Sequence, residues 1–313
     1  MEIAKKRISL VAPFYNEQTG VARFFERINL VLEPILSRYE IEVICVNDGS
    51  RDQTLTELKL ARKKNTYIRI IDLSRNFGKE AALTAGLNFA SGDIIVPIDS
   101  DLQHPPEVIL EMLKRWEEGF EVVLARRIDR ATDRVVQKIT ARAFYEISRK
   151  ISHIEIPSDV GDFRLMDRKV VDAVKTLHEN CRFMKGIFAW VGFRTTVVEY
   201  KVEAREHGKT SFNTWKLWNF ALEGITSFST LPLRIWTYIG AVVSMLAFIY
   251  GVYLTFKTIF IGVETPGYAS LMVVLLFSVG AQLIGIGILG EYLGRVFSEV
   301  KRRPSYIIRE VIE

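Results

Sequence analysis

Two carboxylates one residue apart, Asp99 and Asp101, follow a short apolar run at residues 94–98. In an open α/β sheet, ligands bind at the carboxyl ends of the strands, so we expect this pair to face a ligand. Mg²⁺ is usually held by one or two carboxylates together with substrate phosphates, and Mn²⁺ also prefers oxygen ligands. The pair therefore predicts a Mg²⁺ or Mn²⁺ site that takes a nucleotide diphosphate. The alternative is that the carboxylates only cap the next helix.

Apolar runs alternate with helical patterns through the first half of the chain. The apolar runs span residues 8–12, 41–46, 68–73, 94–98 and 121–125. The helical patterns span residues 17–38, 52–64, 79–90 and 105–118. This alternation predicts an α/β fold with a mostly parallel sheet and right-handed crossovers. The polar clusters that follow the strands would then line one cleft, and they are residues 13–17, 47–50, 74–79 and 99–101.

The C-terminal part of the chain is strongly apolar. The 313 residues are 49% hydrophobic, with a mean hydropathy of +0.13. No charged residue occurs from Ile235 to Phe256, and a helix of that length rises roughly 33 Å, enough to cross a hydrocarbon core of about 30 Å. A second uncharged stretch runs from Thr265 to Gly290. We expect two transmembrane helices, at about residues 235–257 and 267–292; the alternative is a buried hairpin in a soluble protein.

Basic residues flank the two expected spans unequally. Lys257 is the one basic residue between the spans. On the other side, Arg234 precedes the first span, and the second is followed by Arg295, Lys301, Arg302 and Arg303. The positive-inside rule therefore places both termini in the cytoplasm. We expect a cytoplasmic catalytic domain at 1–212, a juxtamembrane interfacial helix at 213–233, and a two-helix anchor with a basic tail at 234–313.

The overall charge is positive, with a formal net charge of +5 and a pI near 9.1. The first 200 residues nevertheless contain no basic run with interleaved aromatic residues, so we expect no nucleic-acid partner. Residues 133–153 carry basic side chains and repeat apolar residues at helical spacing. They predict an amphipathic helix that lies on an anionic lipid surface or packs against the protein core.

Five motifs, in this order, resemble family 2 glycosyltransferases. They are Val-Ala-Pro-Phe-Tyr-Asn-Glu at 11–17, Val-Asn-Asp-Gly-Ser at 46–50, Arg-Asn-Phe-Gly-Lys at 75–79, Asp-Ser-Asp-Leu-Gln-His-Pro-Pro-Glu at 99–107 and Gly-Asp-Phe-Arg-Leu-Met-Asp-Arg at 161–168. Within that family the chain is similar to the polyprenyl-phosphate glycosyltransferases, especially the bactoprenol glucosyltransferases, and more distantly to dolichyl-phosphate mannose synthase. The resemblance implies a GT-A fold and inverting transfer from UDP-glucose to undecaprenyl phosphate at the bacterial inner membrane. It also implies a homotetramer and a separate flippase.

The same resemblance assigns residues to the donor. Asp48 would accept the imide N–H of uracil, although it could instead cap the helix that follows it. Lys79 would meet donor oxygens, or it is a solvated lysine in the first turn of a helix. Asp99 and Asp101 would hold the metal. The full set carried over for the nucleotide sugar is Pro13, Tyr15, Asn16, Glu17, Asp48, Arg75, Asn76, Lys79, Asp99, Ser100 and Gln103.

Asp162, in the fifth motif, matches the acidic residue that the family places near the acceptor. Asp159 is the neighbouring alternative, Asp101 contributes through the metal, and Asp167 is more typical of a helix start. A lipid monophosphate has a second pKa of about 6 and hardly needs a base, so we expect Asp162 to orient the acceptor or a sugar hydroxyl and to take a proton only from the minority monoanion. The lipid phosphate would be bound by Arg164, Arg205, Lys209 and Ser211, unless residues 205–211 are only a solvated basic loop.

Other interpretations stay open. The donor could be GDP-mannose, UDP-N-acetylglucosamine or another nucleotide sugar, and the chain could be an inactive scaffold subunit that binds a nucleotide sugar. Two motifs are set aside. The glycine pattern at 285–290 lies inside an apolar span and fits a helix-packing face better than a dinucleotide site. The P-loop-like sequence at 208–210 has Glu203 where the leading glycine should be.

Overall fold

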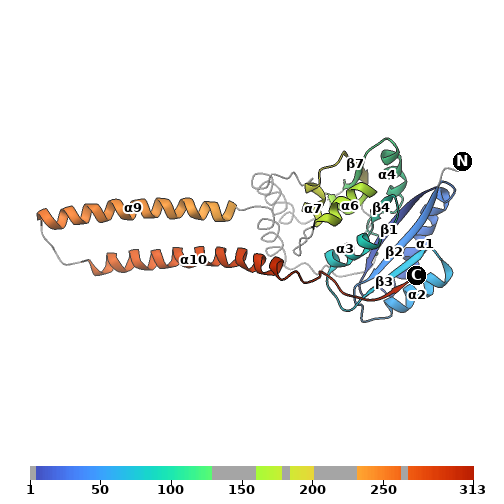
Figure 1. Cartoon of the computed structure of the whole chain (residues 1–313), viewed down its shortest axis with the longest axis horizontal. Helices are drawn as coiled ribbons and strands as arrows, with labels where there is room; N and C mark the ends of the chain where they lie inside the picture. The colour runs from blue at the N-terminus through green and yellow to red at the C-terminus, as the bar shows by residue number, and fades with distance from the viewer. Residues whose placement is uncertain (1–4, 129–159, 178–183, 201–230, 262–266) are drawn as a thin grey trace. The chain divides into compact units, whose positions relative to one another are not determined.

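The computed structural model describes residues 5–128, 160–177, 184–200, 231–261 and 267–313 (Figure 1). The chain divides into two units, one of residues 1–219 with 303–313 and the other of residues 220–302. The second unit is therefore an insertion into the sequence of the first, which resumes after it.

The first unit is built on an eight-stranded sheet with the strand order β7-β5-β6-β4-β1-β2-β3-β8. The strands are β1 (Lys6–Phe14), β2 (Tyr39–Asn47), β3 (Ile68–Leu73), β4 (Ile94–Pro97), β5 (Val122–Arg127), β6 (Val160–Asp167), β7 (Thr195–Tyr200) and β8 (Ile308–Ile312). The pairs β1–β2, β1–β4, β2–β3 and β5–β7 are parallel, whereas β6 and β8 run antiparallel to their neighbours. The prediction of a mostly parallel α/β sheet is confirmed.

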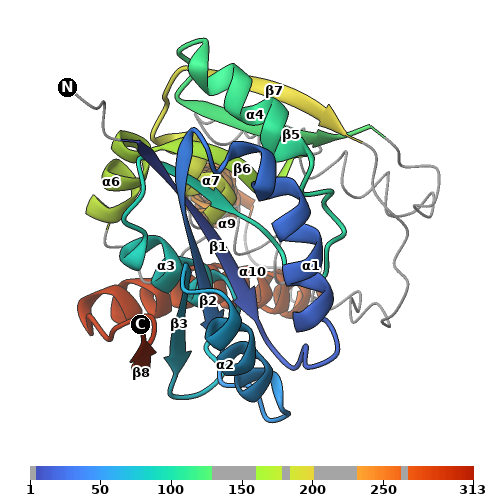
Figure 2. The same ribbon diagram turned by 90° about the vertical axis from the view of Figure 1, so that its right-hand side faces the viewer.

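Helices cover both faces of this sheet (Figure 2). They are α1 (Val21–Leu32), the 3₁₀ turn η1 (Glu33–Ile35), α2 (Thr54–Lys64), α3 (Lys79–Phe89), α4 (Val108–Glu117), α6 (Arg168–Thr176) and α7 (Met184–Trp190). Side chains alternate across a strand, and Leu10 of β1 shares one core cluster with Phe24 of α1. On the other face α3 lies so close that a Cβ on Gly86 would overlap Val11. The core is thus filled from both sides of the central strands.

The predicted helix at 17–38 is shorter in the structure, where α1 begins only at Val21 and ends at Leu32. Its first expected turn is instead a loop, because Asn16 adopts a positive φ of 53° and the following backbone amides bond to side chains near α2. At the other end, Pro34 cannot donate the hydrogen bond that would continue the helix, and a 3₁₀ turn follows. The shortening leaves residues 15–20 available to the site.

The strand β8 was not expected, because residues 234–313 were assigned to the membrane anchor. In the structure, residues 303–313 belong with the sheet, and Ile308–Ile312 pair antiparallel with β3. The edge of β3 offers a row of backbone donors and acceptors, and β8 satisfies them. Ile312 also packs against the main core cluster. The tail is therefore a structural part of the sheet domain.

The second unit contains two long antiparallel helices, α9 (Leu231–Ile261) and α10 (Tyr268–Val300), which lie side by side in Figure 1. They have 31 and 33 residues, lengths of roughly 46 and 50 Å at 1.5 Å per residue. Among the described residues, one segment, Phe277–Val300, is long and apolar enough to cross a membrane. A Cβ on Gly285 would overlap the Trp236 side chain, so this glycine does serve helix packing.

Candidate active site

The parallel strands β4, β1, β2 and β3 lie next to one another, so their carboxyl ends share one edge of the sheet. On either side of β1 the chain winds in opposite directions, toward β2 and toward β4. Such a switch point is where open α/β sheets bind ligands. The four polar clusters predicted from the sequence follow these four strands.

The loop after β1 is joined to the loop after β2 by hydrogen bonds. The amide of Asn16 donates to Ser50 Oγ at 3.0 Å, and Asn16 Oδ1 accepts from the Arg51 amide at 2.9 Å. Pro13 is half-buried, whereas Tyr15 is 43% exposed and unconfined by the core. The loop therefore holds its polar residues firmly and presents one aromatic ring on which a base could stack.

Asp48, in the loop after β2, joins this loop to the loop after β3, and it is only 3% exposed. Its Oδ1 accepts from the Phe77 amide at 2.7 Å, and its Oδ2 accepts from the Gly78 amide at 2.9 Å and from Asn76 Nδ2 at 3.0 Å. Burial raises the pKa of Asp48, and the two backbone hydrogen bonds counteract part of that rise. Asp48 does not cap α2, and in this structure its carboxylate holds the third loop.

The second and third loops also touch through their backbones. Gly49 has a φ of +61°, and a Cβ there would overlap the carbonyl carbon of Arg75. Only glycine meets both requirements without strain. Arg75 lies over the ring of Phe77 at 4.1 Å and donates to the carbonyl of Asn76 at 3.1 Å. Arg75 and Asn76 therefore lie beside Asp48, in a loop whose backbone packs against Gly49.

Lys79, the first residue of α3, joins two carboxylates that are far apart in the sequence. Its Nζ lies 2.6 Å from Asp99 Oδ1 and 3.0 Å from Asp162 Oδ2. The side chains of Lys79, Asp99 and Asp162 are 47%, 26% and 14% exposed. The family resemblance assigned all three residues to the site, but it did not reveal that one ammonium bridges Asp99 and Asp162.

Burial and charge compete at this ion pair. Burial favours the neutral form of Lys79, but Asp99 and Asp162 outweigh it and raise the pKa of the ammonium. Burial likewise favours neutral Asp99, yet the His104 ring and the Lys79 ammonium hold the pKa of this carboxyl well below its usual range. Lys79 and Asp99 therefore remain charged throughout the physiological pH range.

His104 is a site residue that the sequence analysis missed. Its Nε2 lies 3.6 Å from Asp99 Oδ2, its Nδ1 lies 2.5 Å from the hydroxyl of Tyr200, and its ring stacks on Phe163. Burial raises the pKa of Tyr200 to about 12; Arg127 opposes this rise, and Asp99 adds a smaller contribution to it. A protonated Tyr200 can donate to Nδ1, which favours the tautomer with its proton on Nε2, facing Asp99. The Gln-His-Pro-Pro sequence after the carboxylate pair was the available signal.

Asp101 is exposed, and its Oδ1 accepts from the Gln103 amide at 3.1 Å; Ser100 lies half-buried before it. Burial raises the pKa of Glu17, and the nearby charges of Asp101 and Asp52 raise it further. In the part of the chain that the structure describes, no three His, Cys, Asp or Glu side chains form a metal cluster. Asp99 and Asp101 alone fit an ion that takes its other ligands from substrate phosphates and water.

Arg164 differs from the prediction that it would contact the lipid phosphate. It is 4% exposed, donates to the carbonyl of Gly161 at 2.7 Å and lies 4.2 Å from the centre of the Phe188 ring. Burial lowers its pKa to about 10, although Asp162 and Glu80 oppose that shift. A guanidinium enclosed in this way supports β6 from beneath Asp162.

Asp167 is the N-cap of α6, since its side chain accepts from the Lys169 amide at 3.1 Å, as predicted. The remaining predicted site residues and the amphipathic helix lie outside the described residues. They are Asp159, Arg205, Lys209, Ser211 and residues 133–153.

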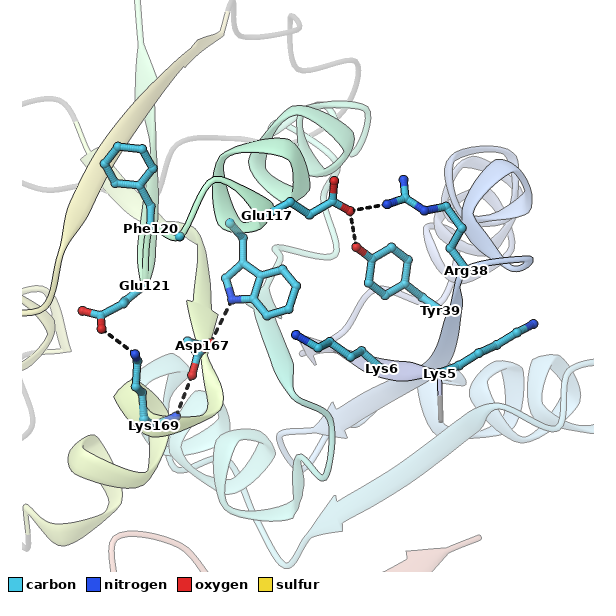
Figure 3. A pocket seen from close by; sticks show the side chains of 11 residues that line it. Lys5, Lys6, Arg38, Tyr39, Glu117, Phe120, Glu121, Asp167 and Lys169 are labelled. Atoms are coloured by element: carbon cyan, nitrogen blue, oxygen red, sulfur yellow. Dashed lines mark hydrogen bonds and ion pairs between the residues drawn. The ribbon is translucent and has the colours of Figure 1, made fainter. Parts of the chain in front are cut away.

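A separate hollow of about 510 Å³ lies at the amino ends of β1 and β2, away from the carboxylate-rich loops (Figure 3). Its polar groups largely satisfy one another. Glu117 accepts from Tyr39 at 2.5 Å and pairs with Arg38 at 2.6 Å, while Trp116 Nε1 donates to Asp167 at 2.9 Å. Because these polar groups pair with one another, we interpret the hollow as a structural feature of the fold. The chemistry is therefore assigned to the opposite edge of the sheet, at the carboxyl ends of the parallel strands.

Known families match two parts of the chain. The family described as Glycosyl transferase family 2 matches residues 9–175, and the family described as GtrB C-terminal hairpin matches residues 231–296. The first match includes most of β1, the strands β2 to β6 and the four loops described above. The second includes α9 and most of α10.

Similar proteins extend along nearly the whole chain. A prophage bactoprenol glucosyl transferase homolog of Escherichia coli (strain K12) is 50% identical over 305 residues, which cover 97% of this chain and 99% of the relative. The bactoprenol glucosyl transferase of Shigella phage SfII is 49% identical over 304 residues, which cover 97% and 98%. An uncharacterized glycosyltransferase of Synechocystis sp. is 52% identical over 304 residues, which cover 97% and 95%.

Proposed function

Since this chain belongs to glycosyl transferase family 2, we propose that it transfers glucose from UDP-glucose to undecaprenyl phosphate. The products would be undecaprenyl-phosphate glucose and UDP. The relatives named bactoprenol glucosyl transferase support the acceptor and the sugar. In the structure, the observation that carries the proposal is the Lys79 ammonium between Asp99 and Asp162, because it joins the side of the site assigned to the donor to the side assigned to the acceptor.

The nucleoside of the donor would lie over the loops after β1 and β2, with Tyr15 available for stacking on the base. We propose that Asp48 acts on the donor through the loop that it holds, because both of its oxygens already accept hydrogen bonds from that loop. The sugar and diphosphate would extend toward Lys79 and the carboxylates after β4. This placement follows the switch point of the sheet.

The residues after β4 fit a divalent metal. We propose that Asp99 and Asp101 hold Mg²⁺ or Mn²⁺ together with the diphosphate, as such ions are commonly bound. When bound, the ion would neutralise the charge that develops on the leaving UDP. Lys79 would add a fixed positive charge beside it and keep Asp99 ionised, and His104 would hold the far oxygen of that carboxylate.

Transfer would proceed in one displacement. A phosphate oxygen of the lipid forms a bond to the anomeric carbon while the bond from that carbon to the UDP oxygen breaks, and the electron pair leaves with UDP. An α-linked donor then gives a β-linked product. The lipid phosphate is largely dianionic at pH 7, with a second pKa of about 6, and needs no base. Among the described residues, Asp162 Oδ1 is buried without a hydrogen-bond partner, so it is suited to accept a bond from a sugar hydroxyl and orient it.

We propose that α9 and α10 both span the bacterial inner membrane, with the catalytic domain and both termini in the cytoplasm. The match to the hairpin family and the exposed apolar side chains of both helices support this arrangement. The helices would anchor the cleft at the depth of the lipid phosphate, which is a gain in proximity and orientation. Assembly into a homotetramer and delivery of the product to a separate flippase remain expectations from the family resemblance.

The test uses the purified full chain with undecaprenyl phosphate, a panel of radiolabelled nucleotide sugars, and Mg²⁺ or Mn²⁺. We expect label from UDP-glucose in the organic-extractable lipid, loss of transfer with EDTA, and loss of most turnover in Asp101→Asn. The matched control is Asp172→Asn, an exposed carboxylate on α6, which should retain activity. If label is transferred only from a different nucleotide sugar, that sugar replaces glucose in the proposal. If the chain binds a donor but transfers no label, the proposal is overturned in favour of an inactive scaffold subunit.

A further inference from the structure

We propose that the strand after the helical hairpin, β8, positions the loop that binds the donor, and that Arg309 is the positioning residue. The donor loop is defined here as residues 74–79, between β3 and α3. The inference rests on the proposed function for its assignment of this loop to the donor. The contacts between β8 and the loop are independent of that assignment.

The tail holds both backbone polar groups of Ser74, the first residue of the donor loop. The Ser74 amide donates to the carbonyl of Ile307 at 2.9 Å. The Ser74 carbonyl accepts from Arg309 Nη2 at 2.6 Å. The residue from which the loop departs is therefore fixed by a segment more than 230 positions later in the chain.

Arg309 also reaches a buried carboxylate beneath the donor loop. Its Nη1 lies 3.2 Å from Asp72 Oδ2; the Arg309 side chain is 57% exposed, but the Asp72 side chain is only 1% exposed, so this pair, unlike one between two surface side chains, includes a buried charge. The other oxygen, Asp72 Oδ1, accepts from Asn47 Nδ2 at 2.7 Å. Asn47 immediately precedes Asp48, which holds the far end of the donor loop. One guanidinium thus contacts the start of the loop directly and its far end through Asp72 and Asn47.

A β-bulge gives Arg309 this position. Asp72 pairs with Glu310 and Leu73 pairs with Ile308, so Arg309 is the extra residue between two paired positions. A bulge re-aims a side chain at the cost of regular pairing, and bulges are common next to active sites. Regular pairing would have placed Arg309 opposite Leu73. The irregularity is what lets one side chain bridge Asp72 and Ser74.

Other contacts of the tail do not lead to the donor loop. Lys59 pairs with Glu310 at 3.2 Å, and both side chains are largely exposed, at 43% and 53%. An exposed pair of this kind contributes little to stability. Lys59→Met is therefore a matched control for Arg309→Met, since each removes one cation that binds the same strand.

The first measurement is hydrogen–deuterium exchange on the full chain in detergent, which needs no substrate. In Arg309→Met we expect the amides of residues 74–79 to exchange about tenfold faster, because a hydrogen bond to a charged group is worth at least that factor. In the same variant, the exchange rates of residues 15–20 should not change. In Lys59→Met, the exchange rates of residues 74–79 should not change. Equal acceleration across the whole sheet, or no acceleration at 74–79, would overturn the proposal.

The second measurement is steady-state kinetics with UDP-glucose and undecaprenyl phosphate. In Arg309→Met we expect the KM for the donor to rise about tenfold while the KM for the lipid stays unchanged, since only the donor loop is released. Arg309→Lys keeps the charge but loses the two-pronged contact, so its donor KM should lie between those of the unmodified chain and Arg309→Met. This variant provides the test if Arg309→Met does not fold. Unchanged donor KM despite faster exchange would refute positioning. Absence of transfer in the unmodified chain would refute the proposed function instead, and the exchange result would still stand.

Discussion

Replacing Lys79 with methionine would leave two carboxylates facing each other without their shared cation. The distances from Lys79 Nζ to Asp99 Oδ1 and to Asp162 Oδ2 are 2.6 and 3.0 Å, so these two oxygens lie within 5.6 Å of each other. At an effective dielectric constant of about 20, two unit charges at that separation repel by about 3 kcal/mol. The Lys79 side chain is 47% exposed, and water screens part of the effect. We therefore expect a loss of about 1.5 kcal/mol in folding stability at neutral pH.

The assay is the apparent Tm of the full chain in detergent between pH 4 and pH 8. A loss of that size corresponds to a fall of about 3–6 °C for a unit of this length. Asp99, whose folded pKa is lowered, contributes stability that is full above its ordinary pKa and is lost only below about pH 4, so in the unmodified chain this contribution stays nearly constant across the assayed range. In the variant the repelling carboxylates take up a proton more readily. The difference in Tm from the unmodified chain should therefore be full above about pH 6 and shrink toward pH 4.

Lys169→Met is the control, because it removes another lysine paired with one carboxylate, Glu121, at 2.5 Å near the surface. Its effect should be small at every pH. In the double variant Lys79→Met/Asp162→Asn, removal of one negative charge should restore about half of the lost Tm. A Tm loss that is the same at pH 4 and pH 8, or a double variant less stable than Lys79→Met, would refute the electrostatic explanation.

Two further predictions concern the loops and the acceptor side. Gly49→Ala should weaken UDP binding, measured by calorimetry, by about tenfold or more, because the added Cβ overlaps the Arg75 backbone. Gly78→Ala is the control, since Gly78 has a φ of +97° but open space around the added Cβ, and it should weaken UDP binding less. Equal losses of affinity would contradict the steric argument. Asp162→Asn should lower the transfer rate by a factor that shrinks as the pH rises from 6 to 8, since the acceptor phosphate then needs no help with its proton. A constant factor would contradict a role in taking the proton of the monoanion and would leave Asp162 with an orienting role alone, and Asp172→Asn should show no effect at any pH.

The repeating βα part of the fold is predictable from the sequence, because each buried strand is a continuous apolar run closed by a polar cluster. The predicted runs correspond to the strands β1 to β5. The strand β6 was not predicted because Asp162 and Arg164 interrupt its apolar character. Inside the fold, Arg164 is held by its bond to Gly161, its contact with Phe188 and the nearby charges of Asp162 and Glu80. The strand β8 escaped because its partner, β3, lies more than 230 residues earlier, and no local pattern encodes such a pairing.

The residue types of the candidate site were predictable, but their partners were not. Asp48, Lys79, Asp99 and Asp162 were all assigned to the cleft, and the structure places the last three in contact. Which backbone amides reach Asp48, and which carboxylates share Lys79, depends on how loops from different strands meet in space. Arg164 was assigned to the lipid phosphate from the family resemblance, and its burial, at 4% exposed, was not predictable from the sequence.

The position of β8 in the chain also sets the order in which the domain is completed during synthesis. Chains emerge from the ribosome N-terminal end first, so the strands β1 to β7 and both long helices are made before residues 308–312 exist. Until then the edge of β3 stays open, and open edges invite pairing with other chains. During that interval the carboxylate of Asp72 also lacks its ion pair with Arg309. The sheet domain therefore reaches its final form only after the hairpin has been translated.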